Sequence, residues 1–198
     1  MVHYFTIYKP FQVLSQFSHL PHEINKQTLK DFFDVPVDVY PVGRLDYDSE
    51  GLLILTNDAN LNHRLLNPSF GHEREYWVQV EGAITNQAIE ELMAGVEFTV
   101  DGKPFKSKKC RAEKMDDEPA LPSRFPPIRF RKNIPVSWIK IVLTEGKNRQ
   151  VRKMTARVGY PTLRLIRYRI GNVNIKGMEP GNIKEFTRSE IYEMLFGN

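Results

Sequence analysis

The sequence predicts an α+β fold with a largely antiparallel mixed sheet and flanking helices. Segments typical of strands and helices follow one another without the regular βαβ alternation that builds a parallel sheet. Val136–Thr144 has the two-residue periodicity of a strand, and Asn148–Val158 has the periodicity of a helix packed by one face. A chain of 198 residues buries roughly 70% of its unfolded surface, which suits one large domain or two small lobes.

The N-terminal elements are predicted from their residue types and their ends. His3–Lys9 alternates aromatic and β-branched residues, which predicts a strand. Gln12–Phe17 is a second candidate strand, and Lys26–Phe33 is predicted as a short helix that Pro36 ends. Leu52–Leu55 is a short apolar run between turn-forming residues, which is typical of a buried strand.

The middle of the chain continues this mixed pattern. Asn57 or Asp58 caps a predicted helix that reaches about Asn67. In Glu73–Glu81 the side chains alternate, so that Tyr76, Val78 and Val80 share one face of a strand. The further segments marked by caps and turns are a helix from Thr85 to about Ala94, a strand over Val96–Val100 and a candidate strand over Cys110–Met115.

The elements of the C-terminal third have the clearest sequence patterns. The strand over Val136–Thr144 leads through a turn at Glu145 and Gly146 into the helix over Asn148–Val158. The helix has its apolar residues on one face and a row of cations on the other, namely Arg149, Arg152, Lys153 and Arg157. Tyr160–Ile175 predicts one or two strands, and Thr187 with Glu190 forms a capping box that opens a helix to about Phe196.

Residues 117–135 form a predicted irregular loop with five prolines. Such long loops are usually functional or disordered. Arginine and phenylalanine alternate in it, and this combination suits phosphate contacts and base stacking. The cationic and aromatic residues of the loop are Arg124, Phe125, Arg129, Phe130, Arg131 and Lys132. A plain basic connector is the alternative interpretation.

The basic residues gather in one part of the chain. The formal net charge of the whole is +4. From Arg124 to Arg169 there are 13 Lys and Arg residues and one acid, Glu145, a net charge of +12, whereas the remaining residues carry 15 basic and 23 acidic groups, a net −8. This asymmetry predicts a positive face on an acidic body. RNA is the natural partner of such a face, and a solvated basic surface without a partner is the alternative.

Other classes of protein are disfavoured. No apolar run approaches the roughly 20 residues of a membrane span, and the N-terminus lacks the features of a signal peptide. We therefore expect a soluble, cytoplasmic protein with no membrane partner. The one cysteine, Cys110, excludes an internal disulfide and is interpreted as a partly buried structural thiol. The five histidines show no metal-ligand spacing, and no dinucleotide fingerprint is present.

The stretch 41–57, PVGRLDYDSEGLLILTN, joins a charged turn to a buried strand. A charged turn at the end of a core strand is a common place for chemistry. Residues 46–51, DYDSEG, resemble the start of a calcium-binding loop. Counted from Asp46, however, the twelfth position is Asn57, where a bidentate glutamate is required. Asp46 and Asp48 are close enough in sequence for acid–base work on a glycoside. The third interpretation is that these side chains only satisfy the backbone of the turn.

A fourth interpretation comes from a resemblance. The stretch GRLDYDSEGLLILTND resembles the catalytic signature of the RsuA-type pseudouridine synthases, and four further stretches are similar to motifs of that family in the same order. They are Tyr4–Pro10, Glu75–Gly82, Leu143–Met154 and Pro161–Arg167. The resemblance implies the pseudouridine-synthase fold, with residues 1–198 as a single catalytic domain whose two lobes flank a central basic cleft. Most members begin with a small RNA-binding domain of S4 type, and we expect this sequence to depart from that pattern by starting directly at the catalytic entry strand.

The implied reaction isomerises a uridine within RNA. The bond from ribose C1′ to N1 breaks, the base turns, and C1′ joins C5. The resemblance places the essential carboxylate on Asp46, which acts as a nucleophile on ribose or base or stabilises charge. Arg152 matches the basic residue of the third motif and is the candidate partner of Asp46, with a phosphate contact as the alternative. Tyr76 matches the tyrosine of the second motif and would stack on the target base. No cofactor or metal is implied.

Further residues are assigned to RNA binding. Arg44 would fill the gap left by a flipped nucleotide or hold the neighbouring phosphate. The other predicted substrate-binding residues come from the third motif and from the basic loop; they are Lys147, Asn148, Arg149, Gln150, Arg129 and Arg131. Asp48 and Glu50 are interpreted as groups that orient Asp46.

The loop 117–135 is most similar to the branch of the family that acts on large-subunit ribosomal RNA. This implies 23S rRNA, or a ribosome-assembly intermediate, as the substrate of a monomeric enzyme. Two alternatives stay open, namely a non-catalytic RNA-binding or ribosome-assembly protein on the same scaffold and a pseudouridine synthase that acts on tRNA. The non-catalytic alternative predicts no need for Asp46.

Overall fold

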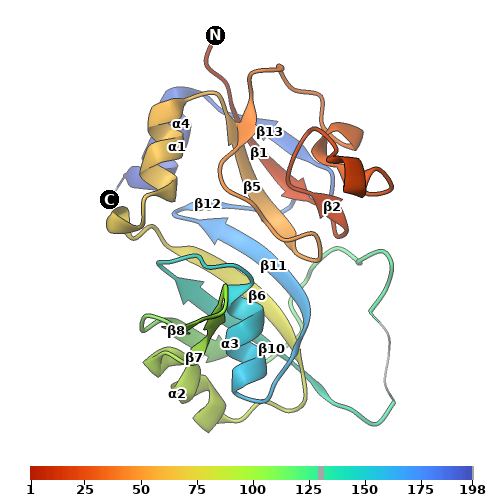
Figure 1. Cartoon of the computed structure of the whole chain (residues 1–198), viewed down its shortest axis with the longest axis vertical. Coiled ribbons are helices and arrows are strands. Elements are labelled where there is room, and N and C mark those ends of the chain that lie inside the picture. The colour runs from red at the N-terminus through yellow and green to blue at the C-terminus, as the bar shows by residue number, and fades with distance from the viewer. Residues whose placement is uncertain (129–131, 198) are drawn as a thin grey trace. The chain divides into compact units, whose positions relative to one another are not determined.

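The structure is a computed structural model that describes residues 1–128 and 132–197 (Figure 1). The chain divides into two compact units, which we describe separately. The first unit comprises residues 1–72 and 167–198, and the second unit comprises residues 73–166. Over the described residues, no helix is both long and apolar enough to cross a membrane.

The first unit is built on two fully buried strands. β1 (Tyr4–Lys9) pairs antiparallel with β5 (Glu50–Thr56), from Tyr4 opposite Thr56 to Lys9 opposite Gly51. Its other edge pairs with β13 (Ile183–Glu185). The aliphatic and aromatic side chains of β1 and β5 form a core with Val13, Leu29 and Phe33, as their apolar runs predict.

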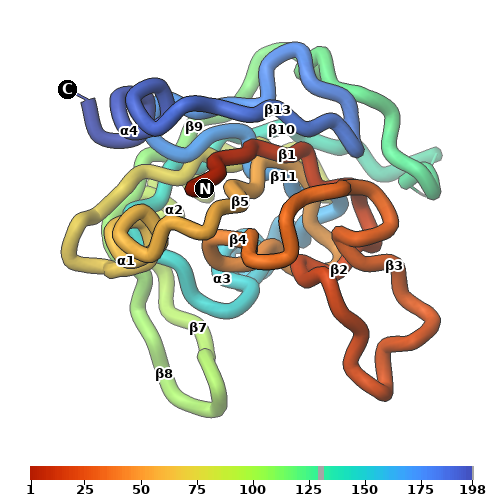
Figure 2. Tube along the Cα trace, turned by 90° about the horizontal axis from the view of Figure 1, so that it is seen from above, coloured from red at the N-terminus to blue at the C-terminus, as the bar shows by residue number. Residues whose placement is uncertain are grey.

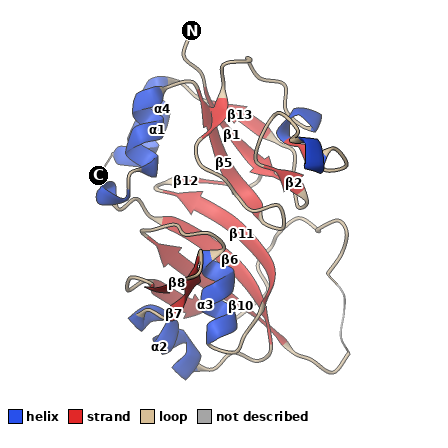
Figure 3. Ribbon diagram, in the orientation of Figure 1, coloured by secondary structure: helices blue, strands red, loops and turns tan. Residues whose placement is uncertain are grey.

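Short elements complete the first unit (Figure 3). The short strand pairs are β2 (Val13–Leu14) parallel to β3 (Gln27–Thr28), β4 (Tyr40–Pro41) antiparallel to β5, and β12 (Val173–Asn174) antiparallel to the end of β11 (Thr162–Ile170). The helices are η1 (Pro21–Glu23), η2 (Leu29–Asp31), α1 (Ala59–Leu66), η3 (Pro68–Phe70) and α4 (Arg188–Phe196).

The second unit combines antiparallel strands with two helices. Its central strand is β10 (Val136–Leu143), between β6 (Arg74–Glu81) and β9 (Arg111–Lys114). The helices α2 (Asn86–Ala94) and α3 (Gln150–Arg157) pack apolar side chains into the same core as β6 and β10. The hairpin of β7 (Glu97–Val100) and β8 (Lys103–Lys106) extends as a narrow finger (Figure 2). β11 begins in this unit and ends in the first.

The predicted α+β class with a mixed, largely antiparallel sheet is confirmed. The helix predicted over Lys26–Phe33 is wrong, because this segment forms β3 and one turn of 3₁₀ helix. Asp31 bonds back to the Thr28 backbone there and closes a capping box around a single turn. The strand predicted over Gln12–Phe17 shrinks to β2. The central basic cleft stays a prediction.

Candidate active site

Residues 42–49 form the turn between β4 and β5, and the backbone fixes this turn at several points. Leu45 is held on both sides by Ser15, whose hydroxyl accepts from the Leu45 N–H at 3.0 Å and donates to its carbonyl at 2.8 Å. The Tyr47 carbonyl accepts from Gln12 N at 2.9 Å, and the Asp46 carbonyl accepts from Ser49 N at 3.0 Å. Asp46 is therefore carried by a turn bonded on both of its sides.

The strand after the turn is held by a close approach of two backbones. A Cβ on Gly51 would lie 2.4 Å from the Arg167 carbonyl oxygen, and Gly51 has φ +106°, a region that glycine adopts without steric cost. The buried Arg167 guanidinium donates from Nε to the Leu52 carbonyl at 2.8 Å. Glycine at position 51 thus allows β5 to lie directly against the end of β11.

Lys9 is the buried cation beneath the turn. Its side chain has no exposed surface, and its Nζ donates to the carbonyls of Pro10 at 2.9 Å and Val13 at 2.7 Å. Burial lowers the pKa of the Lys9 ammonium to about 7, although the charges of Glu50, Asp46 and Asp48 act in the opposite direction and the charge of Arg167 adds to the lowering. A buried ammonium thus interacts with all three carboxylates of the turn region.

The other charged residues of this turn differ in exposure. Arg44 is exposed, Asp46 and Asp48 are half-buried, and Glu50 is buried at the start of β5. The structure therefore brings Arg44, Asp46 and Asp48 together in one turn, as the sequence predicts. A half-buried carboxylate on a fixed turn can serve as a nucleophile, because part of it stays accessible to a substrate.

Tyr76 and Arg152 belong to the second unit. Tyr76 lies on β6 opposite Ile141 of β10 and is 9% exposed. Its ring joins the core cluster that also contains Val151 and Met154 of α3. Arg152 lies on α3 and is half-buried. Asp46 lies in the first unit, so the predicted pairing of Arg152 with Asp46 stays a prediction.

The turn between β10 and α3 is held by two buried polar side chains. Glu145 Oε1 accepts from Lys108 N at 2.9 Å and from Gln150 Nε2 at 2.7 Å. Gln150 Oε1 accepts from Lys147 N at 2.9 Å. Glu145 and Gln150 are 8% and 4% exposed. The burial of Gln150 and the use of both ends of its amide favour a role in shaping the turn over direct contact with a substrate.

The residues between Glu145 and Gln150 are exposed. Lys147, Asn148 and Arg149 are all exposed, and the Lys147 ammonium lies 5.3 Å from the centroid of the Phe105 ring. Arg149 has φ 54° and ψ 32° and stands at the N-cap of α3. This left-handed conformation is uncommon for a residue with a side chain. It explains why the helix starts at Gln150, two residues after the predicted start. We call residues 145–150 the basic turn.

Two predicted substrate-binding residues, Arg129 and Arg131, lie outside the described residues. Lys9 and Glu145 are the functional candidates that sequence reasoning missed. The signal for Lys9 was a lysine at the end of an otherwise apolar strand, directly before Pro10. In the described part of the chain, no three His, Cys, Asp or Glu side chains are grouped so as to hold a metal ion.

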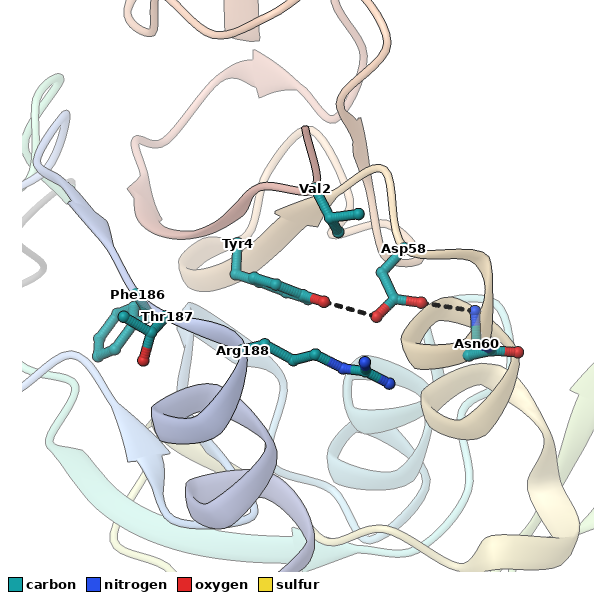
Figure 4. A pocket seen from close by; sticks show the side chains of 7 residues that line it. All are labelled: Val2, Tyr4, Asp58, Asn60, Phe186, Thr187 and Arg188. Carbon is teal, nitrogen blue, oxygen red and sulfur yellow. Dashed lines mark hydrogen bonds between the residues drawn. The ribbon is translucent and has the colours of Figure 1, made fainter.

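A pocket of about 340 Å³ lies elsewhere in the first unit, around Asp58 (Figure 4). The Asp58 carboxylate accepts from Tyr4 Oη at 2.7 Å, from Tyr192 Oη at 2.8 Å, and from two backbone N–H groups of α1. These hydrogen bonds lower the pKa of Asp58 against the effect of burial. Because they occupy both carboxylate oxygens, this pocket is a junction between β1, α1 and α4, and Asp46 is the better candidate for chemistry.

The chain is similar in sequence to known RNA pseudouridine synthases. The sequence profile of the family described as RNA pseudouridylate synthase matches residues 3–157. The chain is 46% identical to ribosomal large subunit pseudouridine synthase E of Vibrio parahaemolyticus over 89% of this chain and 71% of that protein. It is 47% identical to the protein of the same name from Xanthomonas axonopodis pv. citri over 87% of both.

A solved structure supports the same assignment. A pseudouridylate synthase crystal structure superposes with a TM-score of 0.78 at 26% identity, over 98% of this chain and 74% of that one. The matched family profile spans the Asp46 turn, Tyr76 and the basic turn. The chain belongs to the RNA pseudouridylate synthase family, whose members are isomerases that convert uridine to pseudouridine in RNA.

Proposed function

We propose that this chain converts a uridine of 23S rRNA to pseudouridine, with Asp46 as its essential carboxylate. The observation that carries this proposal is the turn 42–49, which is hydrogen-bonded on both sides of Asp46 and whose carboxylates interact electrostatically with the buried Lys9. The ribosomal substrate is supported by the two relatives named as large-subunit synthases.

The proposed mechanism uses the turn as a fixed platform. The Asp46 carboxylate attacks the target nucleotide, or stabilises the charge that develops when the bond from C1′ to N1 breaks. The base then turns, C1′ joins C5 and any bond to Asp46 is released, the proton of C5 leaves to solvent, and N1 takes up a proton from solvent. Because the substrate and product are isomers, the reaction needs no redox partner. Platform rigidity matters because misplacing a reacting group by about 1 Å costs roughly 100-fold in rate.

Tyr76 and Arg152 have proposed supporting roles. Tyr76 would stack on the target base, since its ring sits on a rigid strand and is held by the core of the second unit. Arg152 would stabilise the Asp46 carboxylate or hold a phosphate. The exposed Arg44 would occupy the space left by the flipped nucleotide.

The basic turn is the proposed grip on the RNA backbone. Lys147 and Arg149 are both exposed on a turn that is held by hydrogen bonds. Contacts between such cations and phosphates supply much of the affinity for RNA. Arg129 and Arg131 remain candidates from the sequence. We further propose that the enzyme acts as a monomer in the cytoplasm, on free 23S rRNA or on an assembling large subunit.

The test is the release of tritium from RNA labelled at uridine C5. Asp46→Asn is expected to lower release from unmodified 23S rRNA transcript by at least about 10³-fold, because removal of a nucleophile has effects of this size or larger. Asp34→Asn, which changes an exposed aspartate in the same unit, is the matched control and should release tritium at the wild-type rate.

Two outcomes contradict the proposal. Equal release by Asp46→Asn and wild type would leave the scaffold as an RNA-binding protein whose chemistry lies elsewhere. Release from a tRNA transcript, with none from 23S rRNA, would retain the reaction but replace the substrate.

A further inference from the structure

Phe125 has the most exposed aromatic ring among the described residues, with 86% of its surface accessible. It lies in the long segment between β9 and β10, in the second unit. A phenylalanine held in water forgoes the stabilisation that burial of its ring provides. The fold therefore gains nothing from this side chain as it stands, and a binding role explains it better.

The backbone around Phe125 is held in place. On its N-terminal side, the buried Arg164 of β11 donates from Nη2 to the Pro122 carbonyl at 2.9 Å. Across Phe125 itself, Arg124 Nε donates to the Pro126 carbonyl at 2.9 Å. Two side-chain hydrogen bonds thus hold residues 122–126 and present the ring to solvent, which lowers the entropy lost on binding.

Charge indicates what the ring binds. Phe125 stands at the start of the stretch 124–169, whose net charge is +12, and Arg124 precedes it directly. Ser123 and Arg124 precede the ring and Pro126, Pro127 and Ile128 follow it, so Phe125 is the one aromatic group among the described residues of this loop and stands next to a cation. An aromatic ring among cations matches single-stranded RNA, because every base offers a π face and every nucleotide a phosphate.

We propose that Phe125 stacks on an unpaired base of the RNA substrate, at a nucleotide other than the target uridine. This inference rests on the proposed function, since it takes RNA as the substrate. It adds a requirement on the substrate: an unpaired base must lie within reach of Phe125 when the target is bound. A stem that pairs this base would have to open first, which would make the site selective for a loop or bulge.

The experiment measures binding to unmodified 23S rRNA transcript at several salt concentrations. Phe125→Ala is expected to weaken binding about tenfold, because stacking on an aromatic ring contributes on the order of 1–3 kcal/mol per base. The slope of log K against log salt should not change, since a phenyl ring neutralises no phosphate. Phe125→Trp should keep wild-type affinity, and Phe125→Leu should bind as weakly as the alanine variant.

The matched control is Phe70→Ala, which removes a ring that is 49% exposed in the first unit and should leave binding unchanged. Phe125→Trp also gives a direct signal, because a stacked indole loses fluorescence. Its emission in excess of that of wild type should fall when RNA is added.

The proposal is overturned if Phe125→Ala binds like wild type, if Phe125→Leu keeps full affinity, or if the added tryptophan emission does not respond to RNA. Its failure is distinct from failure of the proposed function. If Phe125→Ala binds like wild type while Asp46→Asn binds RNA normally and releases no tritium, the stacking role fails and the proposed function stands.

Discussion

Two turns of the molecule carry the proposed function, and buried polar groups act on each in a different way. The turn 42–49 of the first unit is hydrogen-bonded on both sides of Asp46, and the buried Lys9 acts electrostatically on Asp46 and Asp48 of the turn and on Glu50 of β5. The basic turn 145–150 of the second unit is held by Glu145 and Gln150 through hydrogen bonds to backbone and amide groups. The first support is a buried charge that titrates near neutral pH, and the second is a hydrogen-bonded bracket.

This difference indicates how chemistry and RNA binding are divided between the two turns. The first turn presents a half-buried carboxylate, which suits chemistry at one atom. The basic turn presents the exposed side chains of Lys147, Asn148 and Arg149, two of them cations, which suits contact with an extended polyanion. Disturbing the first turn should therefore reduce the chemical rate, and disturbing the basic turn should reduce affinity.

The largest expected effect on stability comes from removing the buried amine of Lys9. Lys9→Met removes the donor of the Pro10 and Val13 carbonyls, and leaving buried acceptors unsatisfied costs about 1–3 kcal/mol. Urea unfolding should show this loss. Lys30→Met, at an exposed position, is the control and should change stability little. A Lys9→Met protein as stable as the control would show that these two hydrogen bonds do not stabilise the fold.

The pH dependence of stability gives the second effect. In the unfolded chain Lys9 has an ordinary pKa of about 10.4, whereas burial lowers it to about 7 in the folded protein. Between these pH values the unfolded chain holds a proton that the folded chain has lost, so stability rises with pH. From pH 7 to pH 9, the advantage of wild type over Lys9→Met should grow by about 2 kcal/mol. A constant difference would mean that Lys9 titrates as an exposed lysine.

The third effect tests the hydrogen bonds of Glu145 that hold the basic turn. Glu145→Ala removes the acceptor of Lys108 N and Gln150 Nε2, and leaving buried donors unsatisfied costs about 1–3 kcal/mol. RNA affinity should fall roughly tenfold with little change in the rate at saturation, since a binding energy of about 1.4 kcal/mol corresponds to that factor. Glu145→Gln keeps an acceptor oxygen and should retain the stability and the RNA affinity of wild type. Equal losses in the two variants would assign the effect to charge instead of turn shape.

The smallest effect concerns the backbone of Arg149. Arg149→Ala and Arg149→Gly both remove one cation, so both should lower the salt slope of binding by about 1. Glycine adopts the left-handed conformation seen at this residue without the steric cost that alanine bears. Arg149→Gly should therefore be more stable than Arg149→Ala by roughly 1 kcal/mol. Equal stability would mean that the left-handed conformation is not maintained in solution.

Much of the fold could be predicted from local patterns. The strands β1, β5, β6 and β10 were visible because their side-chain periodicity and apolar runs persist over six to eight residues. The caps Asp58, Thr85 and Thr187 marked their helices because each accepts a hydrogen bond from a backbone N–H of the first turn. These signals are short-range, so the sequence alone carries them.

What the sequence did not show depends on contacts between distant residues. The 3₁₀ turn η2 replaced the helix predicted over Lys26–Phe33; its first residue, Leu29, packs into the core of the first unit and donates from its N–H to the Gln16 carbonyl. The electrostatic environment of Lys9 includes carboxylates some 40 residues away. Glu145 looked like an ordinary residue of a turn, and only its bond to Lys108 N, 37 residues away, shows that it holds the basic turn. None of these contacts has a local sequence signature.

The most direct test of the division between the two turns is the single-turnover rate of tritium release at saturating enzyme, compared between Asp46→Asn and Arg149→Ala. We predict that Arg149→Ala requires more enzyme to saturate but then reaches the wild-type rate, while Asp46→Asn releases no tritium at any concentration. A low saturated rate for Arg149→Ala, or measurable release by Asp46→Asn at high enzyme, would contradict the assignment of chemistry to the first turn and of binding to the basic turn.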